Sequence, residues 1–243
     1  MKRIVVVLGV AAVMAAALAL LAGTALADTT GTRSPLPNEH GWNNSDVTVT
    51  LNSTGDTCGG CGIKEIRYFA LGAQSIPETV YDPQNPPLIN TEGFTSITAY
   101  AIYDNGGQEF PKKKVAGVSI DKTPPEVSST YPLRYDTRVY PDGEILAGFA
   151  PDLSFIDPNT VTTDTFKVVK VKPTGNVPVS GTVRLEHNNP DFTSQTAFFD
   201  PLNSLDKGLY QATITTGVKD NAGNALAKNY TWTFTTLGPP SQS

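Results

Sequence analysis

The chain has 243 residues, of which 23 are acidic and 18 are basic, and its formal net charge is −5. An acidic chain repels the phosphate backbone of nucleic acids, so we expect no nucleic-acid partner. The length allows one or two domains, at roughly 100–200 residues each.

The first 27 residues have the pattern of a secretory signal peptide. Lys2 and Arg3 precede an apolar stretch over residues 4–22, and Ala25-Leu26-Ala27 is a small-x-small cleavage site. The alternative is an uncleaved membrane anchor, because the stretch approaches the ~18–20 apolar residues that span a bilayer. The cleavage site favours export, an extracellular or cell-surface location and no membrane attachment after cleavage. Removing residues 1–27 takes away two positive charges and no acid, which changes the net charge from −5 to −7.

Residues 28–122 contain short segments rich in Val, Ile, Thr, Tyr and Phe between Gly, Pro, Asn and Asp, which is typical of an all-β domain. In residues 47–51, valine and leucine alternate with threonine, so the apolar side chains share one face of a strand. Pro77 and Pro87 fit edge strands near Val80 and Leu88. The main strands predicted for this half cover residues 47–51, 63–71, 95–103 and 114–120.

A second domain is predicted to occupy residues 123–243. Pro124 and Pro125 interrupt the strand pattern, and adjacent prolines favour a stiff extended link, so the boundary is placed there. Residues 157–161 predict one helical turn, with Asp157 as its cap and Pro158 at its first position. Seven strands at this spacing suit a two-sheet sandwich. They are predicted over residues 127–130, 145–149, 166–171, 177–186, 196–199, 209–215 and 230–236.

Both halves resemble bacterial immunoglobulin-like (Ig-like) modules. Residues 35–122 resemble the Ig-like repeats of bacterial surface proteins, and residues 124–237 resemble the Ig-like domain of S-layer proteins. The first resemblance depends on residues 41–51, 62–68, 97–107 and 120–125, and the second on residues 157–161, 199–202, 217–226 and 232–236.

The resemblance implies two tandem Ig-like β-sandwich domains after the signal peptide. Such modules share no active site, so we expect no enzymatic activity and no cofactor. It further implies a structural, adhesive or spacer module of the bacterial envelope, with a cell-envelope polymer or another surface protein as its partner. The alternative is a carbohydrate-binding or accessory module of an extracellular enzyme system, which needs exposed aromatic side chains on one face.

Cys58 and Cys61 are the only cysteines of the chain. In an exported protein they are predicted to form a disulfide that closes a Gly-rich loop. A redox dithiol or half of a zinc site is the alternative, but a zinc site needs four ligands and a redox pair begins a helix in a βαβ context.

Asp220, Asn221 and Asn224 are the candidate ligands for Ca²⁺. One acid falls short of the six to eight oxygens that Ca²⁺ requires, and turn formation alone explains these residues, so the prediction is that they bind no metal.

Catalytic residues are not predicted. His40 and His187 are the only histidines, and no Gly-x-Ser-x-Gly nucleophile motif occurs. Trp232 shares a strand face with Phe234, which predicts a position in the core rather than in a sugar-binding surface.

Overall fold

The structure, a computed structural model, describes residues 27–55, 61–173, 175–187 and 195–237. These residues form strands, turns and one 3-10 turn, and no α-helix occurs among them. The all-β prediction is therefore confirmed. The predicted signal peptide lies outside the described residues except for Ala27. In the part of the chain that is described, no helix is long and apolar enough to cross a membrane.

The chain divides into two compact units. The first contains residues 1–34, 47–89 and 94–117, and the second contains residues 35–46, 90–93 and 118–243. The unit division assigns two short segments of the first half, residues 35–46 and 90–93, to the second unit. The boundary predicted at residues 122 and 123 stays a prediction.

Two antiparallel sheets build the first half, with strand orders β1-β2-β5 and β4-β3-β6-β7. Val47, Val49 and Leu51 of β2 are buried, as their alternation with threonine predicts. The strands are β1 (Asp28–Ser34), β2 (Val47–Thr54), β3 (Ile63–Gly72), β4 (Ile76–Val80), β5 (Leu88–Ile89), β6 (Gly93–Tyr103) and β7 (Lys113–Ile120).

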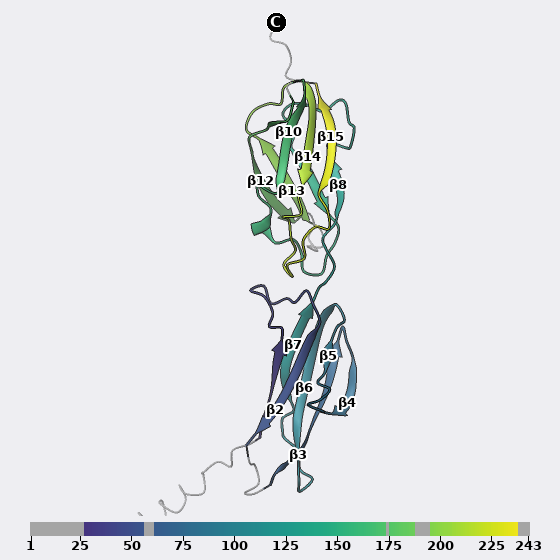
Figure 1. Cartoon of the computed structure of the whole chain (residues 1–243), viewed down its shortest axis with the longest axis vertical. Helices are drawn as coiled ribbons and strands as arrows, with labels where there is room; N and C mark the ends of the chain where they lie inside the picture. The colour runs from purple at the N-terminus through teal and green to yellow at the C-terminus, as the bar shows by residue number, and fades with distance from the viewer. Residues whose placement is uncertain (1–26, 56–60, 174, 188–194, 238–243) are drawn as a thin grey trace, which may run out of the picture. The chain divides into compact units, whose positions relative to one another are not determined.

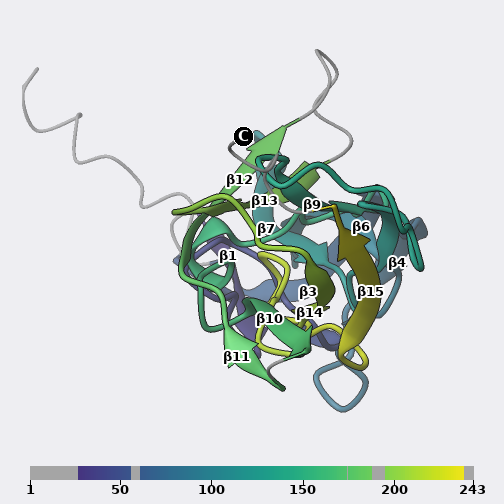
Figure 2. The same cartoon turned by 90° about the horizontal axis from the view of Figure 1, so that it is seen from above.

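Two further sheets build the second half, with strand orders β12-β13-β9-β8 and β11-β10-β14-β15. Figures 1 and 2 show them as two layers, with β12 and β13 in one and β10, β14 and β15 in the other. The strands are β8 (Val127–Tyr131), β9 (Ile145–Phe149), β10 (Phe166–Lys172), β11 (Val177–Pro178), β12 (Gly181–His187), β13 (Gln195–Pro201), β14 (Gly208–Ile214) and β15 (Tyr230–Thr236).

Aromatic side chains fill the core between these two layers. The ring of Phe166 lies 5.7 Å from that of Phe199 and 6.0 Å from that of Trp232, measured between centroids. Tyr210 and Phe234 stack at 5.8 Å. Because Phe199 belongs to one sheet and the other four to the opposite sheet, these rings join the two layers. The burial of Trp232 confirms its predicted place in the core.

The predicted helical turn is present as a 3-10 turn, η2 (Pro158–Thr160). The side chain of Asp157 caps it, because Oδ1 accepts a hydrogen bond from the backbone N–H of Asn159 at 2.9 Å. Pro158 occupies the first position, where its missing N–H costs nothing.

Two segments differ from the predictions. Strand β1 was not predicted, and it pairs along its whole length with β2, from Asp28 opposite Thr54 to Ser34 opposite Thr48. The single strand predicted over residues 177–186 is wrong, because the chain there changes sheets. β11 pairs with β10, whereas β12 pairs with β13 in the opposite layer.

Candidate functional site

Three aspartates from distant parts of the chain meet in the second unit. Asp121 follows β7, Asp152 follows β9, and Asp220 begins the turn between β14 and β15. One carboxylate oxygen from each lies within 4.8 Å of the other two. Asp121 and Asp220 are 0% and 1% exposed, and Asp152 is half-buried. We name these three residues the acidic cluster.

Backbone N–H groups hold the carboxylate of Asp121 in place. Its Oδ1 accepts a hydrogen bond from the N–H of Thr123 at 3.1 Å, and its Oδ2 accepts one from the N–H of Ser154 at 3.0 Å. The first of these is the bond that an aspartate makes two residues ahead when the chain turns. The second ties the end of β7 to the loop after β9.

Asn224 holds the carboxylate of Asp220. Oδ1 of Asp220 accepts the backbone N–H of Asn224 at 2.8 Å, and Oδ2 accepts its side-chain amide, also at 2.8 Å. The same amide donates to the backbone carbonyl of Asp121 at 2.9 Å. Gly223 has a φ of 94°, the left-handed conformation that glycine adopts without strain, so the turn closes as its sequence predicts.

Asp152 is the member of the cluster with an unsatisfied oxygen. Its Oδ1 accepts the N–H of Leu153 at 2.7 Å, whereas Oδ2 is buried and has no hydrogen-bond donor. Burial, and after it the neighbouring charge of Asp121, raises the pKa of Asp152 to about 7. Burial also raises the pKa of Asp220, against the opposing effect of its hydrogen bonds from Asn224.

No positive side chain among the described residues forms an ion pair with the acidic cluster. Lys122, next to Asp121 in the sequence, instead places Nζ 3.0 Å from Oδ1 of Asp46. Three carboxylates in one partly buried place repel one another and lose hydration, and both effects favour the protonated form of Asp152.

The sequence predicted only part of this cluster. Of the candidates Asp220, Asn221 and Asn224, the structure brings the carboxylate of Asp220 into it. The side-chain amides of the two asparagines donate hydrogen bonds instead. The amide of Asn221 donates to the backbone carbonyl of Ser154 at 2.6 Å. Sequence reasoning missed Asp121 and Asp152 as cluster members. One feature of the sequence could have indicated them: all three acids lie next to the end of a strand, and strand ends that are distant in the sequence can lie close together in a folded chain.

The predicted disulfide falls partly outside the described residues. Cys58 is not described, and Cys61 packs with Ile63 against Ala27, Ala101 and Tyr103. The pairing of Cys58 with Cys61 stays a prediction, as do its redox and zinc alternatives.

Titration of the denatured, exported protein is expected to detect no free thiol, because an oxidising compartment favours the short-ring disulfide. The same protein after chemical reduction is the control and is expected to show two thiols. Two thiols without prior reduction would contradict the disulfide.

Three exposed tyrosines lie in the segment that runs from the last residue of β8 into the loop before β9. Tyr135 and Tyr140 are 72% and 73% exposed, and Tyr131 is 45% exposed. We name residues 131–140 the tyrosine loop. By contrast Tyr68, Tyr100, Tyr103 and Tyr210 are buried. The exposed tyrosine rings of the described chain therefore gather in one segment, which the sequence did not single out.

Backbone hydrogen bonds fix the tyrosine loop beside β15. The N–H of Tyr135 donates to the carbonyl of Thr233 at 2.7 Å, and the carbonyl of Asp136 accepts from Thr235, also at 2.7 Å. Arg134 donates to the carbonyl of Thr231 at 2.6 Å. Tyr135 has a φ of 68°, a left-handed conformation that costs a non-glycine residue about 1–3 kcal/mol and is concentrated at functional positions.

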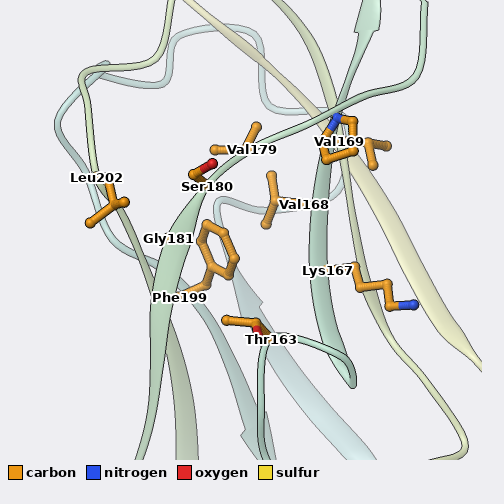
Figure 3. A pocket seen from close by; sticks show the side chains of 10 residues that line it. Thr163, Lys167, Val168, Val169, Val179, Ser180, Gly181, Phe199 and Leu202 are labelled. Atoms are coloured by element: carbon orange, nitrogen blue, oxygen red, sulfur yellow. The ribbon is translucent and has the colours of Figure 1, made fainter.

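A shallow apolar hollow of about 460 Å³ lies where the edges of the two sheets part. Val168, Val179 and the ring of Phe199 line it, and Lys167 points away from that ring (Figure 3). Its polar side chains include those of Thr163 and Ser180, which are uncharged. The lining therefore offers apolar surface, two hydroxyl groups and the side chain of Lys167.

Residues 121–236 match the family model of the bacterial Ig-like domain. No curated protein matches the chain. Among solved structures, the fibronectin(III)-like modules of Clostridium thermocellum CbhA are 12% identical, with a TM-score of 0.32, covering 88% of this chain and 100% of theirs. The eight N-terminal Ig domains of Down Syndrome Cell Adhesion Molecule are 9% identical, with a TM-score of 0.26, covering 86% of this chain and 23% of theirs. Residues 121–236 are therefore a bacterial Ig-like domain, as their resemblance predicts.

Proposed function

We propose that this chain is an exported, non-catalytic Ig-like protein of the bacterial cell surface, which acts as a structural or adhesive module. Bacterial Ig-like domains are common in extracellular proteins, and they are typically non-catalytic. The signal peptide predicted over residues 1–27 supports export. The partner is a cell-envelope polymer or another surface protein, and the S-layer is one setting that the sequence resemblance favours.

The tyrosine loop is the observation that carries the adhesive role. Tyrosine and arginine are enriched where proteins bind partners, because a tyrosine ring buries a large apolar area at a low entropy cost and keeps a polar tip. Tyr135, Tyr140 and Arg134 belong to a segment that backbone hydrogen bonds hold against β15. A loop that is already ordered loses little conformational freedom on binding.

An accessory module that binds carbohydrate is the second candidate. The same loop favours it, because exposed tyrosine rings can cover the apolar faces of sugar rings. The two candidates differ in the partner: a soluble polysaccharide should compete for a carbohydrate site but not for a site that binds a surface protein.

Co-sedimentation with purified cell envelope tests the proposal. The full exported chain is expected to sediment with envelope from the producing bacterium. The double variant Tyr135→Ala/Tyr140→Ala is expected to bind at least about 10-fold more weakly, since central tyrosines are common binding hot spots. Phe110→Ala, which truncates an exposed ring in the first unit, is the matched control and should bind like the wild type.

Each outcome decides between the candidates. If protease treatment of the envelope abolishes the binding, the partner is a surface protein. If soluble envelope polysaccharide displaces the chain, the result supports the carbohydrate-binding module. A chain that stays entirely in the supernatant contradicts the adhesive role. Equal binding by the double variant and the wild type contradicts the role of the tyrosine loop.

A further inference from the structure

We propose that a hollow between β1 and β7, in the first unit, binds an anionic group of a cell-envelope polymer, either a carboxylate or a phosphate. Arg33 of β1 and Lys114 of β7 line this hollow together with Gly31 and Gly117. We name it the basic hollow. The polymer as partner rests on the surface role proposed above, whereas the site itself is separate from the tyrosine loop, which belongs to the second unit.

The basic hollow lies where edge strands of two sheets come together. β1 is the edge of one sheet of the first half, and β7 is the edge of the other. A Cβ added to Gly31 would lie 3.1 Å from the carbonyl oxygen of Val115, so glycine lets the two strands approach closely. It also places no side chain in the space between them, which is an open hollow of about 270 Å³.

A backbone carbonyl holds the guanidinium group of Arg33 in this hollow. Nη1 of Arg33 donates a hydrogen bond to the carbonyl of Gly117 at 2.6 Å, which connects β1 to β7. This bond uses one of the five N–H donors of the planar group, and its fork of donors matches the oxygens of a carboxylate or a phosphate. Because Arg33 is half-buried and already oriented, little of its freedom is lost when an anion binds.

The ring of Phe94 positions the ammonium group of Lys114. Nζ of Lys114 lies 4.8 Å from the ring centroid, which is a cation–π contact. A Cβ added to Gly117 would lie 3.1 Å from Cε2 of Phe94 and 3.8 Å from Cε of Lys114, so both side chains pack over this glycine. Gly117 therefore lies next to both cationic side chains, one bonded to its carbonyl and the other above its Cα.

Neither cation of the basic hollow has a carboxylate partner in the described part of the chain. Lys112 and Lys113, which precede Lys114, each contact a carboxylate. No ion pair between described residues includes Arg33 or Lys114. Two like charges beside one glycine repel each other, and an anion that contacts both removes this repulsion.

The distribution of charge along the chain directs an anionic polymer to the first unit. From residue 28 onward, this unit contains six basic and seven acidic residues, a net charge of −1. The second unit contains ten basic and sixteen acidic residues, a net charge of −6. A polyanion is therefore repelled mainly by the second unit, and the unpaired cations of the basic hollow attract it to the first.

Affinity electrophoresis of the full exported chain at low ionic strength tests this site. The gels contain polygalacturonate, whose sugars carry carboxylates, or inorganic polyphosphate, or neutral dextran. We expect at least one of the two polyanions to retard the wild type and dextran not to. Retardation by polygalacturonate alone indicates a carboxylate ligand, by polyphosphate alone a phosphate ligand, and by both a site for either anion.

The double variant Arg33→Gln/Lys114→Gln is expected to bind the polyanion at least about 10-fold more weakly, because it removes both charge-assisted contacts. Arg33→Lys keeps the charge but not the planar fork, so its affinity should lie between those of the wild type and the double variant. Lys114→Gln alone, which changes an exposed side chain, should weaken binding by about 3-fold or more. Lys64→Gln removes the same charge from an exposed lysine elsewhere in the unit and should bind like the wild type.

Equal retardation of Lys64→Gln and Lys114→Gln would show that net charge attracts the polymer, and it would overturn the site. So would the absence of retardation by both polyanions, or equal retardation by dextran. Circular-dichroism melting curves check that each variant remains folded.

The result is separable from the surface role. The variant Tyr135→Ala/Tyr140→Ala should bind the soluble polyanion like the wild type, because the tyrosine loop belongs to the other unit. If the wild type sediments with cell envelope but binds neither polyanion, the basic hollow is overturned and the surface role stands. If it binds a polyanion but does not sediment with envelope, the anion site stands and the surface role is contradicted.

Discussion

Replacement of Phe166 by alanine is expected to lower the free energy of unfolding of the second unit by about 3–5 kcal/mol. The Phe166 side chain is fully buried, and its ring contacts Phe199 in the opposite sheet and Trp232 two strands away in its own sheet. Truncation loses the apolar contacts of the ring and leaves a cavity where the two layers meet. Because interiors are closely packed, neighbouring side chains can fill that space only in part.

Urea unfolding followed by tryptophan fluorescence measures this loss, because the indole of Trp232 is buried beside the substituted ring. Tyr140→Ala is the control in the same unit, and as an exposed substitution it should change stability by less than about 0.5 kcal/mol. The same measurement on Tyr135→Ala/Tyr140→Ala checks that the variant used in the binding experiment remains folded. A loss below about 1 kcal/mol for Phe166→Ala would mean that this ring does not join the sheets.

Side-chain alternation predicted most of the strands because each sheet has one buried face. In β15, Trp232 and Phe234 point into the core while Thr231, Thr233 and Thr235 face the other way, so local sequence alone determines the assignment. The same pattern located β2 and β6. Prolines near the short strands β4 and β5 also indicated correctly that these lie at sheet edges.

Segments without an alternating pattern could not be predicted in this way. The sequence of β1, Asp-Thr-Thr-Gly-Thr-Arg-Ser, contains no large apolar residue, and only its pairing with β2 makes it a strand. The run over residues 177–186 looks continuous because its apolar residues serve both layers in succession. The change of sheet between β11 and β12 is a tertiary feature, and no local period records it.

The acidic cluster was hidden for a related reason. Asp121, Asp152 and Asp220 are separated by 31 and 68 positions in the printed sequence, and each alone is an ordinary loop aspartate. Asp220 attracted attention because asparagine and glycine surround it in a turn. Only the folded chain places the residue after β7, the loop after β9 and the β14–β15 turn together, so single-sequence reasoning finds one member of the cluster out of three.

A buried glutamate, Glu109, connects β1 to the rest of the first unit, and its removal is expected to lower the free energy of unfolding of that unit strongly. Glu109 is 2% exposed, and its Oε1 accepts the backbone N–H of Thr29 at 3.2 Å. Oε2 accepts the hydroxyl of Thr29 and, at 3.1 Å, the backbone N–H of Ala101 in β6. Nζ of Lys113 lies 3.2 Å from Oε1. One carboxylate therefore links β1, β6 and β7.

Glu109→Ala is expected to destabilise the first unit by about 3–5 kcal/mol, because it leaves buried donors without their acceptor and removes one of the two carboxylates that contact Lys113. Glu109→Gln keeps one acceptor oxygen and the size of the side chain, so its loss should be smaller. Glu78→Ala removes a glutamate whose partners, Lys112 and Arg67, are at the surface, and solvent screening should make its effect much weaker. Chemical unfolding with hydrogen exchange at the amides of β1 separates the three variants. If Glu109→Ala unfolds no more easily than Glu78→Ala, then backbone pairing with β2 alone holds β1, and the buried carboxylate is not what attaches that strand to β6.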